Sequence, residues 1–259
     1  MEHSSSNPRA HLWGLLWTLV RTDFKTRYHG SLSGLLWALL KPLAMFGVLM
    51  AIFSLIFSSD PNYKLNLVVG LFVWDFFAES TKTGLGSLHA KGFLLTKAKF
   101  PSWLLVVAST SNAIIALTVF SVIIVVYLSL TASLSFTSVL LYLLYQFCFL
   151  CIVLGISLAS SVLFLRYRDL NQIWDVSLQA GFFIAPIIYP LGLLPEAVHA
   201  PLFLWPPTPI IQFSRDVLIA GTVPSLKAHV LLFLCTAAIL GTGALIYRRL
   251  GPRAAEYLG

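Results

Sequence analysis

Long apolar stretches separated by short polar segments make up most of the chain. Each is about as long as an α-helix that crosses the hydrocarbon core of a bilayer, which needs roughly 20 apolar residues. The approximate bounds of these stretches are Ser31–Phe57, Leu65–Leu88, Trp103–Leu130, Ser138–Leu165, Leu170–Tyr189 and Leu226–Tyr247. The pattern predicts an all-α, polytopic membrane protein whose six transmembrane helices form one domain, residues 31–248.

A segment before the first span, His11–His29, has two different faces at helical spacing. Its apolar face consists of Leu12, Leu15, Leu16, Leu19 and Phe24. Its polar face consists of Thr18, Arg21, Thr22, Lys25 and His29. This predicts an N-terminal amphipathic helix on the cytoplasmic membrane surface, within a cytoplasmic region of residues 1–30. The basic residues could either bind anionic headgroups or dock a cytosolic partner, and the sequence leaves both open.

Proline marks two irregular places. Lys41-Pro42 interrupts the first span, where proline removes a backbone donor and predicts a kink. Lys41 could extend its ammonium to the inner interface or face a polar path. Seven of the 13 prolines lie from Pro186 to Pro209, a density that no continuous helix tolerates. Because residues 191–223 are nevertheless apolar, we expect short re-entrant helices that form an outer gate between spans five and six.

Composition and charge agree with this reading. Of the 259 residues, 58% are hydrophobic and only 10% charged, whereas a soluble domain has about 25% charged residues. With the N-terminus inside, 13 of the 17 lysines and arginines lie on or near the cytoplasmic side, and only Lys64, Arg215 and Lys227 lie outside. The positive-inside rule therefore places both termini, including a tail of residues 249–259, in the cytoplasm. Topology accounts for the net charge of +7 without a nucleic-acid partner.

Two predicted spans carry polar faces. In the second, Asp75, Glu79 and Lys82 are three to four residues apart on one helical face. The fifth has a similar face formed by Gln172, Asp175 and Gln179. Ionisable groups inside a membrane are costly and mark candidate functional sites. They could line a translocation path, or they could serve packing through an ion pair near the helix end and interhelical hydrogen bonds.

Nothing in the sequence predicts catalysis, a cofactor or a metal. No P-loop, HExxH or GxSxG pattern occurs, and the six histidines lack ligand spacing. Cys148, Cys151 and Cys235 fall in apolar stretches, which favours buried thiols over a disulfide, a redox pair or a zinc site.

Several short motifs follow one another in a recognisable order. They are Arg21–Tyr28 with Gly30-Ser31, Gly34–Trp37 closing at Pro42, Gly70 with Trp74–Phe77, Leu94–Lys97 with Phe100-Pro101, Arg168–Leu170, Phe182–Pro190, and Arg215. Their order over nearly the whole chain resembles the permease subunit of type-2 ABC exporters, in the branch that exports O-antigen, capsular polysaccharide or teichoic acid. Two positions depart from that family's pattern. Pro206-Pro207-Thr208-Pro209 stands where Asn-Pro is common, and Lys41 stands where relatives often have a neutral polar residue.

The resemblance implies a homodimer in the bacterial inner membrane, with two copies of a separate cytosolic subunit that binds ATP and Mg²⁺. The cargo would be a lipid-linked polysaccharide moved outward along the dimer interface, and this chain would not be an enzyme. The implied ATPase contacts are Arg21, Lys25, Arg27, Lys91, Lys97 and Lys99. The implied path residues are Trp74, Asp75, Glu79, Gln172, Asp175 and Gln179. The implied outer gate residues are Pro186, Pro190, Trp205 and Arg215.

Other functions fit the sequence less well. A type-2 exporter of a drug or a small lipid would have the same fold and is the alternative for the cargo. An intramembrane enzyme needs clustered acids, bases or metal ligands, and the outer region offers only Glu196, His199, Arg215 and Asp216. A secondary transporter would more often show interrupted helices in both halves, whereas the proline-rich break occurs in one.

Overall fold

The computed structural model describes residues 8–28, 34–58, 60–97, 100–131 and 134–253, and these form helices and short connections without a strand. The long helices are α1 (Pro8–Tyr28), α2 (Gly34–Phe53), α3 (Tyr63–Ala90), α5 (Trp103–Thr131), α6 (Phe136–Arg166), α7 (Leu170–Ile184) and α10 (Leu226–Leu250). The short ones are α4 (Gly92–Lys97), η1 (Leu191–Leu193), α8 (Glu196–Phe203), α9 (Pro207–Arg215), the π-helical η2 (Asp216–Ala220) and η3 (Gly251–Arg253).

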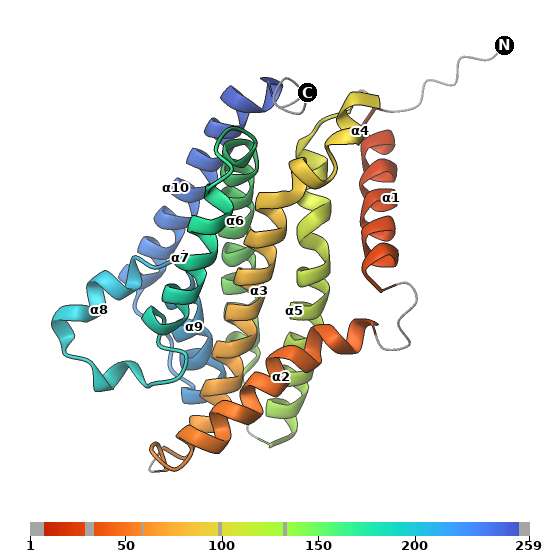
Figure 1. Cartoon of the computed structure of the whole chain (residues 1–259). Helices are drawn as coiled ribbons and strands as arrows, with labels where there is room; N and C mark the ends of the chain where they lie inside the picture. Colours follow the sequence, from red (N-terminus) through yellow and green to blue (C-terminus); the bar gives the residue numbers. More distant parts are fainter. Residues whose placement is uncertain (1–7, 29–33, 59, 98–99, 132–133, 254–259) are drawn as a thin grey trace.

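The helix α3 lies at the centre of the bundle. It packs against α5 and α6 along its length and also contacts α2, α7 and α9 (Figure 1). Its side chains Leu67, Val69, Val73, Phe77 and Leu85 are fully buried. The helix α2 crosses this bundle obliquely, and α8 projects from its side (Figure 1). The central position of α3 explains how a helix with several charged residues is held in an otherwise apolar bundle.

Helix length and composition support part of the predicted topology. Among the described residues, α5, α6 and α10 are each long and apolar enough to cross a membrane. The helix α3 has 28 residues but carries Asp75, Glu79 and Lys82, and α2 has 20 residues with Lys41 inside it. The structure is therefore an all-helical one with several long apolar helices, and the count of six crossings stays a prediction.

The fifth predicted span is shorter in the structure than in the sequence analysis. We expected a helix to Tyr189, but α7 ends at Ile184 after 15 residues. The reason is Pro186, because the residue before a proline is displaced from helical geometry, and Ala185 is extended. A helix of this length rises only about 22 Å, less than the hydrocarbon thickness of about 30 Å. By contrast, α2 continues as a helix on both sides of Pro42.

The short helices after α7 agree with the expected break. Residues 191–220 form η1, α8, α9 and η2 instead of one continuous helix. The connection between α3 and α5 contains the short helix α4.

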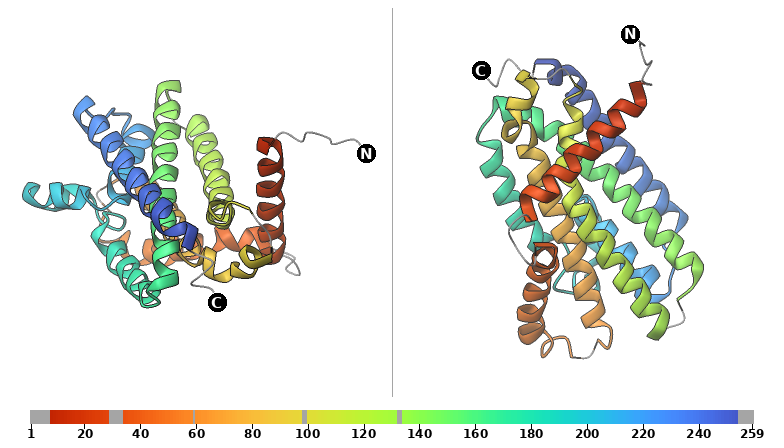
Figure 2. Two further views of the ribbon diagram at one scale, coloured as in Figure 1. Left: turned by 90° about the horizontal axis from the view of Figure 1, so that it is seen from above. Right: turned by 90° about the vertical axis from the view of Figure 1, so that its right-hand side faces the viewer.

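The helix α1 packs along α5 and crosses it obliquely in the right-hand view of Figure 2. Its predicted apolar residues Leu12, Leu15, Leu16, Leu19 and Phe24 are all half-buried, whereas Thr18, Arg21, Thr22 and Lys25 are exposed. The exposed side also carries Trp13 and Trp17, with 72% and 68% of their surface accessible. The two faces of this helix therefore follow the sequence pattern, and His29 lies outside the described residues.

The closest helix pair in the bundle, α6 and α10, meets at two glycines. A Cβ atom built on Gly243 would lie 2.1 Å from the main-chain oxygen of Gly155, and one on Gly155 would lie 2.6 Å from the oxygen of Ile239. Small residues at such crossings let two backbones approach closely in a membrane, where apolar burial alone gives little attraction between helices.

Gly243→Ala should therefore destabilise the protein, by about 1–3 kcal/mol, because the added methyl group forces the two backbones apart. Gly241→Ala is the matched control, since a Cβ there meets nothing within 4 Å. It should leave stability unchanged or raise it by up to about 1 kcal/mol through helix propensity. Thermal unfolding of the purified variants in detergent would measure both, and equal effects at the two glycines would contradict this packing argument.

Candidate functional site

Two ion pairs join α3 to its neighbours on one face of the bundle. Asp75 of α3 accepts from Lys41 of α2, with 3.1 Å between Oδ1 and Nζ. One and two turns further along α3, Glu79 and Lys82 follow, and Lys82 pairs with Asp175 of α7. Lys82 also donates to the main-chain oxygen of Asn171 at 3.4 Å. The sequence placed Asp75, Glu79 and Lys82 on one helical face, and the structure adds the partners from α2 and α7.

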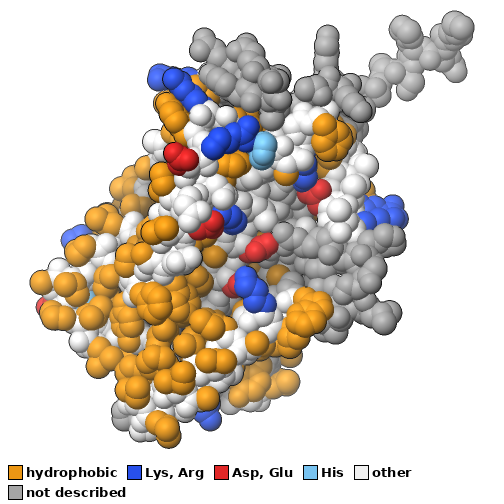
Figure 3. All heavy atoms as spheres, viewed as in Figure 1, with side chains coloured by type: hydrophobic (Ala, Val, Ile, Leu, Met, Phe, Trp, Pro, Cys, Tyr) orange, Lys and Arg blue, Asp and Glu red, His pale blue; other side chains and the backbone are white. Residues whose placement is uncertain are grey.

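This charged face, defined here by Lys41, Asp75, Glu79, Lys82 and Asp175, is only partly buried. The side chain of Lys41 is 69% exposed and that of Asp75 is 26% exposed. Figure 3 shows charged side chains gathered on the side of the molecule that carries α3 and α7, next to a large apolar surface. Exposed ions at the centre of a bilayer are costly unless protein or water covers them. The face therefore requires a polar cover in the membrane.

The exposed surface of α7 has a polar side next to an apolar edge. Gln172 and Gln179 are exposed on the side of the helix that carries Asp175. Ile173 and Val176, which are 58% and 57% exposed, form an adjacent apolar edge. Five of the six predicted path residues thus reach the surface on one side of the chain.

Trp74, the sixth predicted path residue, differs from the others because only 8% of its surface is exposed. It lies in an aromatic cluster with Phe77 of α3, Phe182 of α7 and Trp205 of the connection between α8 and α9. Its ring centroid is 5.8 Å from those of Phe77 and Phe182 and 6.4 Å from that of Trp205. In this chain Trp74 holds the outer segment against α3 and α7 and does not reach the surface.

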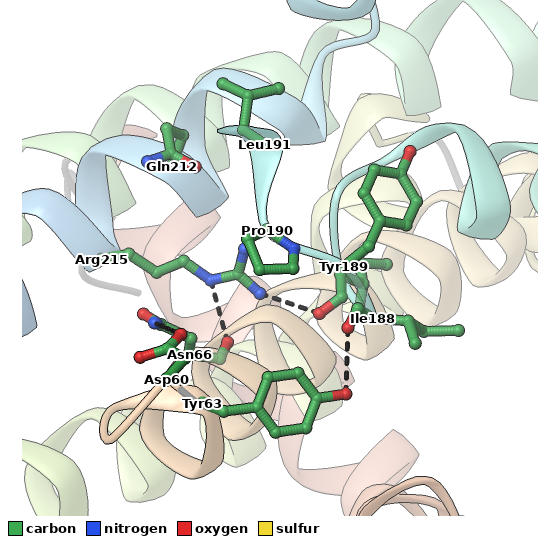
Figure 4. Close-up of a pocket in the computed structure, with 10 residues that line it drawn as sticks. Asp60, Tyr63, Asn66, Ile188, Tyr189, Pro190, Leu191, Gln212 and Arg215 are labelled. Atoms are coloured by element: carbon green, nitrogen blue, oxygen red, sulfur yellow. Dashed lines mark hydrogen bonds between the residues drawn. The ribbon is translucent and has the colours of Figure 1, made fainter. Parts of the chain in front are cut away.

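A buried arginine fixes the break after α7 (Figure 4). Arg215, at the end of α9, is 6% exposed, and its guanidinium donates to three main-chain oxygens. Nη1 donates to Pro186, Nη2 to Ile187 at 2.9 Å, and Nε to Asn66 of α3 at 2.9 Å. The Tyr63 hydroxyl donates to the next oxygen, that of Ile188, at 2.9 Å. Three consecutive carbonyls that lie beyond the last turn of α7 thus receive side-chain donors from α9 and α3.

Two glycines make room for these anchoring side chains. A Cβ on Gly70 of α3 would lie 2.6 Å from Nη2 of Arg215. A Cβ on Gly181 of α7 would lie 2.4 Å from the Trp205 ring. Of the four predicted gate residues, Arg215 and Trp205 therefore each occupy a glycine socket, while Pro186 is buried and Pro190 half-buried beside them. The helix α8, which precedes Trp205 in the chain, has no buried residue.

Sequence reasoning missed most of the partners that hold this region. Gly70 and Phe182 stand within the motifs that carry the family resemblance. Those motifs do not show that the Arg215 side chain packs against Gly70. Tyr63 and Asn66 lie in the first turn of α3 with no distinguishing signal. Tyr63 donates to the Ile188 carbonyl and Asn66 accepts from the Arg215 guanidinium, and both partners lie more than 100 residues away along the chain.

The predicted ATPase contacts fall into three groups. Arg21 and Lys25 are exposed on α1. Lys91 instead turns inward, where it pairs with Asp23 of α1 and donates to Ser109 of α5 at 2.8 Å. It therefore ties α1 to the bundle. The side chains of Arg27 and Lys97, together with the whole of Lys99, lie outside the described residues.

The part of the chain that the structure describes contains no group of three or more His, Cys, Asp or Glu residues that could hold a metal ion. The three cysteines are unpaired, and only Cys148 is buried. The expectation of buried thiols is wrong for Cys235, which lies on the exposed side of α10 because the apolar residues there face outward from the bundle.

Comparison with known proteins gives consistent results. Residues 14–219 match the model of the family described as ABC-2 type transporter. The chain is 30% identical over 255 residues to an O-antigen export system permease protein, RfbA, of Klebsiella pneumoniae, covering 96% of each chain. It is 29% identical over 196 residues to an RfbA of Myxococcus xanthus, covering 74% of each. It is also 21% identical over 234 residues to the polysialic acid transport protein KpsM of Escherichia coli, covering 89% of this chain and 91% of KpsM.

Gly70 and Arg215 should show coupled effects on stability. Gly70→Ala alone should destabilise the protein by about 1–3 kcal/mol, because its methyl group displaces the guanidinium. Arg215→Ala should cost about 1–3 kcal/mol for each carbonyl left without a donor. In the Arg215→Ala background, Gly70→Ala should then cost little, which a double-mutant cycle of thermal unfolding would detect.

Gly192→Ala provides the control in the same outer region, since a Cβ there meets open space. It should leave stability unchanged in either background. Strictly additive effects of the Gly70 and Arg215 substitutions would contradict the inference that the Arg215 guanidinium packs directly against Gly70.

Proposed function

This chain belongs to the ABC-2 type transporter family, and from that premise we propose that it is the membrane-spanning subunit of an ATP-driven exporter of lipid-linked polysaccharide of the O-antigen type. The observation that carries the proposal is the similarity to an O-antigen export permease over 96% of both chains. The more distant similarity to a polysialic acid transport protein extends over nearly the same length. Both names describe polysaccharides, so we favour a glycan over a drug or a small lipid.

The proposed topology is six crossings with both termini in the cytoplasm. The C-terminal end of α10, the turn between α6 and α7, and α4 all lie at one end of the molecule (Figure 1). In the predicted topology, most of the lysines and arginines lie at this end of the molecule. By the positive-inside rule, this supports its assignment to the cytoplasm. We place it in the bacterial inner membrane.

The proposed path runs along the charged face, between two copies of this chain. Lys41, Asp75, Glu79 and Asp175 need a polar environment inside the bilayer, and a water-filled conduit at a dimer interface provides one. The exposed amides Gln172 and Gln179 extend this surface and offer hydrogen bonds to sugar hydroxyls. The ion pairs keep the lysines neutralised, so the lining presents no strong net charge to the cargo.

The proposed outer gate is the segment from Pro186 to Arg215. Its N-terminal end, residues 186–188, and its C-terminal part, from Trp205 to Arg215, are anchored on α3 and α7, whereas α8 between them lacks buried side chains. Such an arrangement lets the middle of the segment move while its ends stay fixed. Closure of the ATPase pair would shift the dimer between two packings and move this segment.

The proposed ATPase contacts are the exposed Arg21 and Lys25 of α1, with Arg27, Lys97 and Lys99 proposed from the sequence alone. The energy source would be a separate subunit that binds ATP and Mg²⁺, present in two copies. We do not propose Lys91 as a contact, because its ammonium is engaged by Asp23 and Ser109.

The cargo can be tested by deleting the gene in its native host. We expect lipid-linked glycan to accumulate inside the cell and surface glycan to be lost, and the wild-type chain to restore both. Asp75→Leu should restore export poorly, because it leaves the Lys41 ammonium without its partner inside the membrane. Val176→Leu, an apolar change on the neighbouring edge of α7, should restore export fully.

Immunoblots of surface glycan and analysis of extracted lipid carriers would measure these results. Normal surface glycan together with increased sensitivity to toxic compounds would instead favour a drug exporter. Full export by the Asp75 variant would assign this ion pair to packing.

The ATPase contact can be tested by co-purification from the native membrane. A tagged wild-type chain should recover an ATP-binding subunit in equal amount. Combined charge reversal of Arg21→Glu and Lys25→Glu should reduce that recovery and the ATPase activity of the complex, because it places acidic groups on the docking surface. Lys227→Glu, at the opposite end of the bundle, should have no effect. Unchanged recovery with the α1 variant would remove this helix from the docking surface.

A further inference from the structure

An apolar groove lies between α2, α3 and α5, away from the charged face. Each helix contributes side chains at intervals of one turn, so that three ridges enclose the groove. The lining consists of Leu39, Leu43 and Phe46 of α2, Lys64, Leu65, Val68 and Phe72 of α3, and Phe120, Ile123, Ile124 and Tyr127 of α5. Phe72 and Phe120, stacked with ring centroids 3.9 Å apart, bring α3 and α5 together beneath it. Its empty volume is about 820 Å³, including the part that is open to the surroundings.

The groove surface is apolar, and two of its lining residues, Lys64 and Tyr127, carry polar groups near one end. Lys64 is the second residue of α3, and Tyr127 lies in the last turns of α5, so both stand at the end of the bundle away from the chain termini. Within the described residues the Lys64 ammonium has no ion pair or side-chain partner, in contrast to Lys41, Lys82 and Lys91. The groove therefore combines an apolar trough with one unneutralised cation at its mouth.

The groove is separate from the proposed path. On α2, Leu39, Leu43 and Phe46 share one side, and Lys41 is on the opposite side of the same helix. The helix α2 thus stands between the charged face and the groove. A ligand in the groove would touch the rear of α2 without entering the path.

We infer that this groove is a binding site for an anionic membrane phospholipid, with an acyl chain along the apolar ridges and the phosphate at Lys64. Hydrocarbon fills an apolar trough without leaving polar groups unpaired, and the linings of small-ligand sites are predominantly apolar. A lysine near a membrane surface favours anionic over zwitterionic headgroups. The occupant bridges α2 to the α3–α5 pair, so it stabilises the position of the helix that carries Lys41.

The test uses the full chain in its complex, reconstituted in nanodiscs with equal amounts of phosphatidylglycerol and phosphatidylcholine. Both lipids carry a photoreactive group at the end of one acyl chain, and crosslinked peptides are identified by mass spectrometry. We expect phosphatidylglycerol to label the groove peptides of α2, α3 and α5 preferentially. Lys64→Gln should lower the ratio of phosphatidylglycerol to phosphatidylcholine labelling by roughly fivefold, the effect of losing one lysine at an anionic site.

Lys227→Gln is the matched control, because Lys227 is also an exposed lysine and the second residue of its helix. It should leave the labelling ratio in the groove unchanged. Val68→Phe, which fills the trough and keeps Lys64, should reduce labelling by both lipids while preserving recovery of the complex.

Three results would overturn the inference. Equal labelling of the groove by the two lipids would remove headgroup selection, and so would an unchanged ratio in the Lys64 variant. No labelling of the groove peptides by either lipid would show that neither lipid occupies the groove. None of these results bears on the cargo, which the deletion experiment tests separately.

Discussion

Backbone carbonyls in an apolar environment need donors, and the region that follows α7 is arranged around that requirement. Pro186 and Pro190 end α7 early, which leaves consecutive carbonyls at 186, 187 and 188 without helical partners. The guanidinium of Arg215 and the hydroxyl of Tyr63 supply the missing donors. A lysine could not replace this arginine, because a single ammonium lacks the planar fork that reaches several acceptors at once. The hydrogen bonds of this one side chain join α9 to α3 and to the segment that follows α7.

The same reasoning explains the placement of charge. Asp75 and Lys82 of α3 are held in the bundle because partners reach them from α2 and α7. These ion pairs join α2, α3 and α7, the three helices that carry the charged face. A shift of one helix that separates a pair would therefore also leave charges unpaired on that face. The helices α5, α6 and α10 carry no such groups along their centres and are the ones whose composition alone suits lipid.

Close packing through glycine is the second recurring device. Gly155 and Gly243 bring α6 and α10 into backbone contact, and Gly70 and Gly181 receive Arg215 and Trp205. In each case the small residue determines how near two elements lie. The helix α8 extends from this glycine-packed part of the molecule and contacts it through Phe203, whose ring centroid lies 6.0 Å from that of Phe213.

From the amino-acid sequence one can predict the helical class, the approximate ends of α5, α6 and α10, the break between Pro186 and Pro209, and the two faces of α1. These follow from local properties, namely the length of apolar runs, helical periodicity and the missing donor of proline. The packing of the helices was needed to show that Asp75 pairs with Lys41, that Lys91 turns toward Asp23, that Trp74 is buried, and that Arg215 lies against Gly70. Each of these depends on contacts between residues far apart in the chain. A periodic pattern shows which residues share a face of a helix, but the packing of the helices decides what that face meets.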